Sequence, residues 1–204
     1  NLRTFWICLG FGIAVNLTWH FYRLWLPLLL QEERGMSYRN SQYVQIAFFL
    51  AADAGSLLAG WFTRRMVAGG YSVERSRQVM MFATSALCLL SWPAATSSNL
   101  NVAIPMLLLI SMGAMGGFAS FYSMTQEISG PHTSRCLGVI GFVIWVLIAI
   151  MQPQVGKLVD RIGTFVPVLI AAGFVPIIGS LLSFAWPSAP AEAPVVEEPE
   201  HAAV

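Results

Sequence analysis

Charged residues are scarce in this sequence. Asp, Glu, Lys and Arg make up 10% of its 204 residues, whereas soluble proteins carry about 25%. Hydrophobic residues account for 56%, and the mean hydropathy is +0.67. A chain of this length cannot bury so much apolar surface within a water-soluble globule. The sequence therefore predicts an integral membrane protein surrounded by a lipid bilayer.

Two further shortages narrow the possible functions. The formal net charge is only +1 and no stripe of basic residues occurs, which excludes a nucleic-acid partner. The chain has three cysteines, an odd number, and each lies in or beside an apolar run. A disulfide scaffold is therefore excluded. We expect neither a metal nor an organic cofactor.

Six apolar runs are long enough to cross a bilayer, because a helical span needs about 20 residues. Their continuous hydrophobicity favours helices over the alternating strands of a barrel. Residues 187–204 hold four prolines and four glutamates, and we expect them to form a disordered tail. We expect an all-α bundle of six transmembrane helices within residues 1–186, at about 5–30, 43–63, 78–96, 102–127, 137–157 and 164–186.

The basic residues outside the runs predict the orientation. The side of the membrane that holds the amino end has six Lys and Arg, and the other side has four. Since basic residues favour the cytoplasmic side, we expect both ends of the segment to be cytoplasmic, in a cell inner (plasma) membrane. The chain begins without Met or a signal-peptide pattern, and it is expected to be a fragment cut at a loop.

Two similar sequence motifs occur at the ends of the second and fifth runs. Gly60 precedes Arg64 and Arg65 by one turn, and in 156–163 a glycine likewise precedes Asp160 and Arg161. An odd number of spans separates the motifs, which puts them on opposite faces of the membrane. That arrangement is typical of a 3+3 inverted repeat in a secondary transporter. Chance recurrence of a glycine followed by charge is the alternative.

Longer phrases resemble a known family. Residues 156–163 resemble the G-x-L-x-D-R-x-G loop motif of the major facilitator superfamily. Three stretches resemble its anion:cation symporter family, which includes hexuronate and galactonate permeases: W-H-F-Y-R-L-W-L-P-L-L-L-Q-E-E-R-G-M-S (19–37), A-A-D-A-G-S-L-L-A-G-W (51–61) and Q-E-I-S-G-P-H (126–132). The resemblance covers residues 3–186 and follows the order of the family's carboxyl-terminal six helices.

The resemblance implies a function and partners. It implies symport of a small organic anion, such as a hexuronate or aldonate, by ion-coupled alternating access. The coupling ion would be a proton or sodium, and a missing amino-terminal six-helix half would complete the carrier. The family's counterpart of Tyr22 faces the substrate path, which gives Tyr22 that role here.

Polar residues in the first run are candidates for substrate binding, since polarity at membrane depth is costly. Asn16, His20 and Arg23 are spaced i, i+4 and i+7, which places them on one helix face. An amide, an imidazole and a guanidinium suit a carboxylate with several hydroxyls. The alternatives are that Arg23 snorkels to the interface and that Asn16 and His20 bond a neighbouring helix.

Two deep polar residues in other runs extend this prediction. Asp53 is the only carboxylate at the centre of a run; it either relays a proton or contacts substrate, or it makes a structural hydrogen bond. By depth, its nearest cationic candidates are Arg23 and His20. Ser120 lies deep enough in the fourth run to contact a sugar acid. The G-x-x-x-G that precedes it predicts close helix packing.

Charged residues at the helix ends are candidates for ion pairs that exist in only one transport state, because only differential contacts shift a conformational equilibrium. Setting the topology, or capping a helix in the case of Glu127, is the alternative reading. The candidates are Arg64, Arg65, Glu127, Asp160 and Arg161.

We do not expect an enzyme. An intramembrane aspartyl protease needs two deep aspartates, whereas only Asp53 is deep, and the G-x-S-G of an intramembrane serine protease does not occur. The alternatives to anion transport are a major facilitator carrier of a neutral solute, a drug exporter, and a non-transporting membrane sensor. Arg23 argues against the neutral solute.

Overall fold

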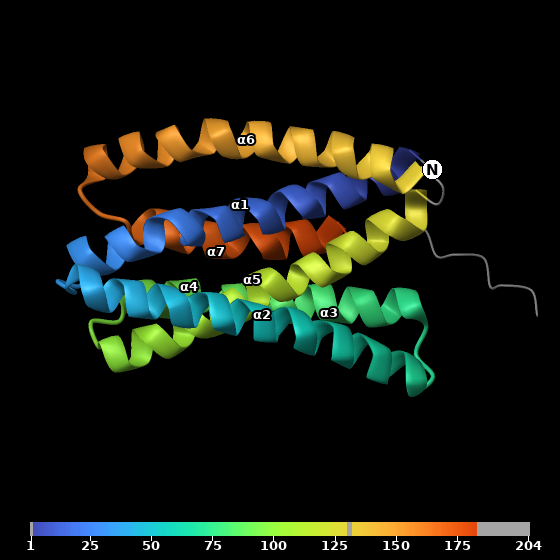
Figure 1. The fold of residues 1–204 in the computed structure, drawn as a ribbon, viewed down its shortest axis with the longest axis horizontal. Helices are drawn as coiled ribbons and strands as arrows, with labels where there is room; N and C mark the ends of the chain where they lie inside the picture. The colour runs from blue at the N-terminus through green and yellow to red at the C-terminus, as the bar shows by residue number, and fades with distance from the viewer. Residues whose placement is uncertain (1, 130–131, 183–204) are drawn as a thin grey trace, which may run out of the picture.

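The computed structural model describes residues 2–129 and 132–182, with side chains described for 5–126 and 132–182 (Figure 1). No strand occurs among these residues, so the all-helical prediction is confirmed for them. The end of the last expected run and the tail at 187–204 lie outside the described residues. The helices are α1 (Leu2–Glu32), α2 (Tyr38–Ala68), α3 (Val73–Cys88), α4 (Ser91–Thr96), α5 (Leu100–Ser129), α6 (Thr133–Ile162) and α7 (Val166–Leu181).

The helices form an elongated bundle (Figure 1). The four longest, α1, α2, α5 and α6, have 30 or 31 residues and therefore extend for about 45 Å. In Figure 1, α6 lies along one side, α1 and α7 lie in the middle, and α2 to α5 lie along the other side. Five helical segments are long and apolar enough to cross a membrane, and α7 is a shorter apolar helix. The chain is a multi-pass membrane protein.

The third expected run is broken in the structure. It was expected to be one helix at 78–96, but α3 ends at Cys88 and α4 begins at Ser91. Pro93 explains the break: it has no N–H to bond the carbonyl of Leu89. The chain tightens here, because the N–H of Leu90 bonds the carbonyl three residues back, at 3.2 Å.

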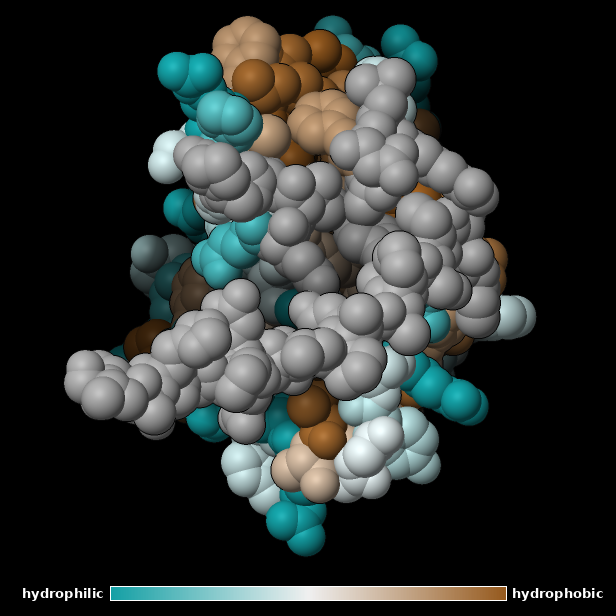
Figure 2. Space-filling view, turned by 90° about the vertical axis from the view of Figure 1, so that its right-hand side faces the viewer, coloured by the Kyte–Doolittle hydropathy of each residue, from teal (hydrophilic) through white to brown (hydrophobic). Residues whose placement is uncertain are grey.

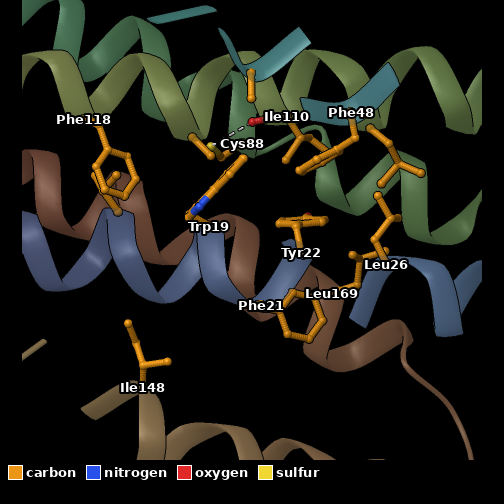
Figure 3. Packing of buried hydrophobic residues seen from close by; sticks show 14 of the residues in the cluster. Trp19, Phe21, Tyr22, Leu26, Phe48, Cys88, Ile110, Phe118, Ile148 and Leu169 are labelled. Carbon is orange, nitrogen blue, oxygen red and sulfur yellow. Dashed lines mark hydrogen bonds between the residues drawn. The ribbon is translucent and has the colours of Figure 1, made fainter. Parts of the chain in front are cut away.

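Helix α1 occupies the centre of the bundle. Within the apolar windows, 72% of the α1 residues are buried, against 22% in α2 and 17% in α6. Its neighbours α2, α5, α6 and α7 all pack against it. Large side chains from these helices fill the core around α1 (Figure 3). The outer faces of α2 and α6 therefore offer most of the exposed apolar surface.

Glycines allow the closest helix contacts. A Cβ added at Gly55 of α2 would lie 2.3 Å from the carbonyl oxygen of Met112 in α5. A Cβ at Gly113 of α5 would lie 2.4 Å from the carbonyl oxygen of Thr84 in α3. Both distances are too short for any side chain. The close packing that the G-x-x-x-G predicted is therefore confirmed.

Two prolines leave backbone carbonyls without their helical N–H donors, and side chains of neighbouring helices donate hydrogen bonds to these carbonyls instead. Pro27 cannot donate to the carbonyl of Arg23, and Gln45 of α2 donates its Nε2 to that oxygen at 3.2 Å. Pro176 of α7 likewise leaves the carbonyl of Ala172 without its helical donor. Thr18 of α1 donates its hydroxyl to that oxygen at 2.7 Å. These two bonds tie α1 to α2 and to α7.

The connection between α1 and α2 fastens one end of the bundle. Glu33 accepts a hydrogen bond from the N–H of Phe165, which precedes α7, at 2.5 Å. Arg34 donates to the carbonyls of Ala94 and Ala95, at 3.0 and 2.8 Å, near the end of α4. Both contacts satisfy backbone groups that a helix end leaves open. The side chain of Ser37 caps the start of α2 by accepting a hydrogen bond from the N–H of Asn40.

Candidate functional site

Asn16 lies in a crevice between α1, α5 and α6, and His20, one turn along α1, packs against Trp145 of α6. Asn16 lines a cavity of about 220 Å³ together with Tyr122 of α5 and Trp145 of α6. Its amide nitrogen donates to the carbonyl of Gly12 within α1, at 2.8 Å. Asn16 is 9% exposed and His20 is 6% exposed. The structure thus brings together two of the three residues on the predicted strip.

Helix α6 holds His20 on two sides. The imidazole ring lies 4.8 Å from the Trp145 ring, centroid to centroid. Gln152 donates its Nε2 to the backbone carbonyl of His20 at 3.3 Å and accepts from the indole N–H of Trp25 at 2.6 Å. A polar contact of α6 therefore fixes α1 at the depth of the strip.

Arg23 continues the strip toward the fastened end of the bundle. Its side chain is exposed, while its carbonyl accepts from Gln45. Arg23 does not line the cavity of Asn16; it lies about 10 Å farther along α1, with an exposed side chain, whereas Asn16 and His20 are buried.

Tyr22 lies elsewhere. It is fully buried in the apolar core and stacks on Phe48 of α2, with ring centroids 5.9 Å apart (Figure 3). Two residues of helix turn a side chain by about 200°, so Tyr22 and His20 point in nearly opposite directions. The structure does not bring Tyr22 to the strip, and its role at the substrate path stays a prediction.

Asp53 is exposed on α2 rather than buried. Within the described part of the chain, no hydrogen bond or ion pair joins it to Arg23 or His20. At 1.5 Å per residue, it lies about 9 Å farther than Arg23 from the fastened end. Asp53 shares its helix face with Ser56 and Gly60, as the spacing predicts. The structure therefore separates it from the α1 strip.

Ser120 and Arg64 line a second cavity, of about 380 Å³, between α2, α3 and α5. Arg77 of α3, which was not among the residues predicted from the sequence, also lines this cavity. The turn after α2 brings it there: Gly70 adopts a φ of +91°, and α3 folds back beside α2. The polar lining residues are Ser56, Thr63, Arg64, Arg77, Ser120 and Ser123.

The charged residues at helix ends lie at opposite ends of the bundle. Arg64 and Arg65 end α2 near the α2–α3 turn, and Asp160 and Arg161 end α6 at the other end (Figure 1). All four side chains are exposed. The Arg65 guanidinium lies 5.7 Å from the centroid of the Trp61 ring, a cation–π distance.

No ion pair joins the Arg64–Arg65 pair to the Asp160–Arg161 pair. The two pairs are separated by most of the length of the bundle. The side chain of Glu127 lies outside the described residues. The state-dependent ion pairs therefore stay predictions. No cluster of three or more His, Cys, Asp or Glu that could hold a metal occurs in the described part of the chain.

Figure 2 looks onto the end of the bundle that carries the α2–α3 turn. Hydrophilic side chains gather around the edge of this end, including the lower part of the view, where the turn lies. Hydrophobic surface appears between them. This pattern fits a helix end at a membrane–water interface.

No protein-family profile matches the chain. Two curated relatives do, and both are named as transporters. The "Probable L-galactonate transporter" of Escherichia coli strain K12 is 27% identical over 184 residues, which cover 88% of this chain and 40% of the relative. The "D-galactonate transporter" of Escherichia coli O6:H1 strain CFT073 is 30% identical over 176 residues, covering 82% of this chain and 39% of the relative.

Both alignments extend over most of the chain. The chain spans about two fifths of the length of the curated relatives it matches. It is therefore related to transporters through one part of their length.

Proposed function

We propose that this segment belongs to a secondary transporter that moves a sugar acid, such as a hexuronate or aldonate, by ion-coupled alternating access. The observation that carries the proposal is the alignment of most of the chain with two galactonate transporters. Galactonate is a six-carbon carboxylate with hydroxyls on its other carbons. The binding groups that it requires are a cation for the carboxylate and neutral hydrogen-bonding groups for the hydroxyls.

The α1 strip supplies groups of both kinds. Arg23, exposed farther along α1, can bind the carboxylate through paired charge-assisted hydrogen bonds. Asn16, in the crevice, and His20, one turn along α1, can bind hydroxyls. Trp145 closes the crevice from α6 and offers an apolar wall. Asp53, on the exposed face of α2, is proposed to tune the charge of the path rather than to touch the strip.

The pairing of the helices supports a 3+3 inverted repeat. The first triplet consists of α1, α2 and the third run, which is divided into α3 and α4; the second triplet consists of α5, α6 and α7. The first helices of the two triplets, α1 and α5, pack against each other. The second and third helices of each triplet then pack on the first helix of the other triplet: α2 and α3 on α5, and α6 and α7 on α1. A pseudo-two-fold axis between the triplets produces such reciprocal pairing. We propose that the segment is the carboxyl-terminal half of a major facilitator carrier.

The rest of the proposal follows from this assignment. An amino-terminal six-helix half would complete the substrate path, and a proton or sodium ion would drive uptake. The exposed pairs Arg64–Arg65 and Asp160–Arg161, at the two ends of the bundle, would make contacts that differ between the outward and inward states. Both ends of the segment would lie in the cytoplasm, because the arginine-rich α2–α3 turn favours that side.

Uptake of labelled D-galactonate by cells that express the complete protein tests the proposal. Arg23→Ala should abolish uptake without lowering the amount of protein in the membrane. Arg39→Ala is the matched control, because Arg39 is an exposed arginine in the first turn of α2, off the strip. Uptake by the Arg23 variant at the wild-type rate would reject the anion role. A wild-type protein that moves no labelled sugar acid would instead favour a sensor.

A further inference from the structure

An apolar groove lies between α2 and α3, where both helices pack on α5. Its volume is about 360 Å³. Among the described residues that line it, only Thr84 has a polar side chain, and the Thr84 hydroxyl donates to the carbonyl of Met80 in the same helix, at 2.7 Å. The groove therefore presents no free side-chain donor to an occupant, and it suits a hydrocarbon chain.

The groove is open to the outside of the bundle. Gly55 and Ala59 of α2 line it and are buried. Leu58 is 42% exposed and Phe62 is 47% exposed, and Ala83 is exposed on the α3 side. The groove extends about 10 Å along α2, from position 55 to position 62. In a multi-pass membrane protein, such an apolar opening between two helices is placed to take up hydrocarbon from the bilayer.

A cation lies at one end of this groove. Leu58, Phe62 and Arg65 are spaced i, i+4 and i+7 on α2, so Arg65 continues the helix face that lines the groove. It lies about one turn closer than Phe62 to the α2–α3 turn. Its side chain is exposed, and no ion pair joins it to another residue of the described chain. The nearby Trp61 ring, 5.7 Å from the guanidinium, is of the kind that marks a membrane–water interface.

The surroundings of Arg65 are basic. Residues 61–77 contain four arginines and one carboxylate, that of Glu74. Arg64 and Arg77 line the other cavity between these helices. Arg75 lies about 140° around α3 from Met80, away from the groove. Arg65 is therefore the arginine of this turn that is aligned with the groove.

An anionic phospholipid matches both features. An acyl chain fits the apolar groove, and a phosphate accepts charge-assisted hydrogen bonds from a guanidinium. Basic pockets between transmembrane helices bind negatively charged headgroups in this way. A soluble anion would leave the groove unfilled, and an uncharged lipid would leave Arg65 without a partner. A zwitterionic phospholipid would bring its ammonium group into the basic turn.

We propose that the groove between α2 and α3 binds an anionic phospholipid, with one acyl chain against Leu58 and Phe62 and the phosphate at Arg65. This site is separate from the α1 strip, which lies on the face of α1 toward α6. The proposal concerns the lipid partner of the protein and does not depend on which solute the protein moves.

Native mass spectrometry of the complete protein in detergent tests the proposal. Dissociation constants are measured for phosphatidylglycerol and phosphatidylcholine with identical acyl chains. Phosphatidylglycerol should bind more tightly, and Arg65→Gln should weaken its binding about fivefold, the effect typical of one basic residue at an anionic membrane surface. Arg75→Gln is the matched control, because Arg75 is an exposed arginine of the same turn that does not line the groove. It should leave the affinity nearly unchanged.

Filling the groove tests the place of the acyl chain. Ala83→Trp adds an indole at the exposed edge of the groove, so it should abolish the tight binding of phosphatidylglycerol. Ala86→Trp is the control, because Ala86 is exposed on the same helix but does not line the groove. Glycerol phosphate, which has the phosphate but no acyl chain, should not compete with the lipid.

Three results would overturn the proposal. Equal affinities for the two lipids, unchanged by Arg65→Gln, would mean that the groove holds only unselected bilayer lipid. Equal binding by Ala83→Trp and Ala86→Trp would place the phospholipid elsewhere, as it would be if an amino-terminal half covered the groove. Competition by glycerol phosphate would indicate a site for a soluble phosphate instead.

Discussion

The hydroxyl of Thr18 should stabilise the bundle more than other threonine hydroxyls in it. Pro176 leaves the carbonyl of Ala172 without an N–H donor, and Thr18 supplies the only described replacement, at 2.7 Å. Thr18→Val keeps the shape of the side chain but leaves this carbonyl unsatisfied. Such a loss costs about 1–3 kcal/mol in proteins, and hydrogen bonds between membrane helices average about 0.6 kcal/mol. We therefore expect the free energy of unfolding to fall by about 1 kcal/mol.

Thr84→Val is the matched control. Thr84 is also buried, but its hydroxyl donates to the carbonyl of Met80 within its own helix, at 2.7 Å. That carbonyl keeps its helical N–H donor, so the control should change the free energy of unfolding by only a few tenths of a kcal/mol, at about the noise of such comparisons. The free energies are measured by reversible denaturation in mixed detergent micelles.

A double-mutant cycle tests the cause of the effect. Pro176→Ala restores an N–H at position 176 that can bond the carbonyl of Ala172. In that background, Thr18→Val should cost clearly less than it does in the wild-type protein. An equal cost in both backgrounds would refute the reasoning from the proline. An effect of Thr84→Val as large as that of Thr18→Val would refute it as well.

Two further predictions concern the packing and the fastened end. Gly113→Leu should lower the free energy of unfolding by about 3 kcal/mol or prevent folding, because its Cβ would meet the backbone of α3. Gly138→Leu is the control and should fold normally, because a Cβ at Gly138 lies in open space. Thermal unfolding curves of the two variants compare their stabilities. Arg34→Gln should speed amide hydrogen exchange in α4, since it removes donors to Ala94 and Ala95. Unchanged exchange would contradict the capping role of Arg34.

The architecture follows from features that the sequence displays locally. Long apolar runs require helices in a membrane because every backbone N–H and C=O must be bonded within the segment. The serine before α2 caps it, and the G-x-x-x-G in α5 meets a neighbouring backbone. The break at Leu89–Leu90 also had a local signal, Pro93. Because the run at 78–96 is apolar throughout, its hydropathy nevertheless predicted one continuous helix.

The candidate site depends on contacts that the sequence does not display. Pairing of Gln45 with the carbonyl of Arg23 requires that α1 and α2 be adjacent at that depth. Arg77 reaches the polar cavity only because the α2–α3 turn is tight. Exposure of Asp53 could not be predicted either, since α2 is apolar around most of its circumference and its periodicity identifies no inner face.

The role of Tyr22 at the substrate path rests on resemblance alone and stays a prediction. Its spacing from His20, two residues, already places it on the far side of α1. The structure agrees with the spacing and buries Tyr22 against Phe48. The resemblance contributed the substrate class, while the helical geometry determined which polar residues share a face.

Water accessibility of α1 in the complete protein tests the central claim most directly. Single cysteines at Asn16, His20 and Arg23 are exposed to a membrane-impermeant thiol reagent, with Leu17→Cys as the control, because Leu17 lines an apolar cavity instead. If the strip lines the transport path, all three positions react in at least one transport state, and D-galactonate slows their labelling while Leu17→Cys stays unreactive. Three positions that remain unreactive in every state would contradict the account.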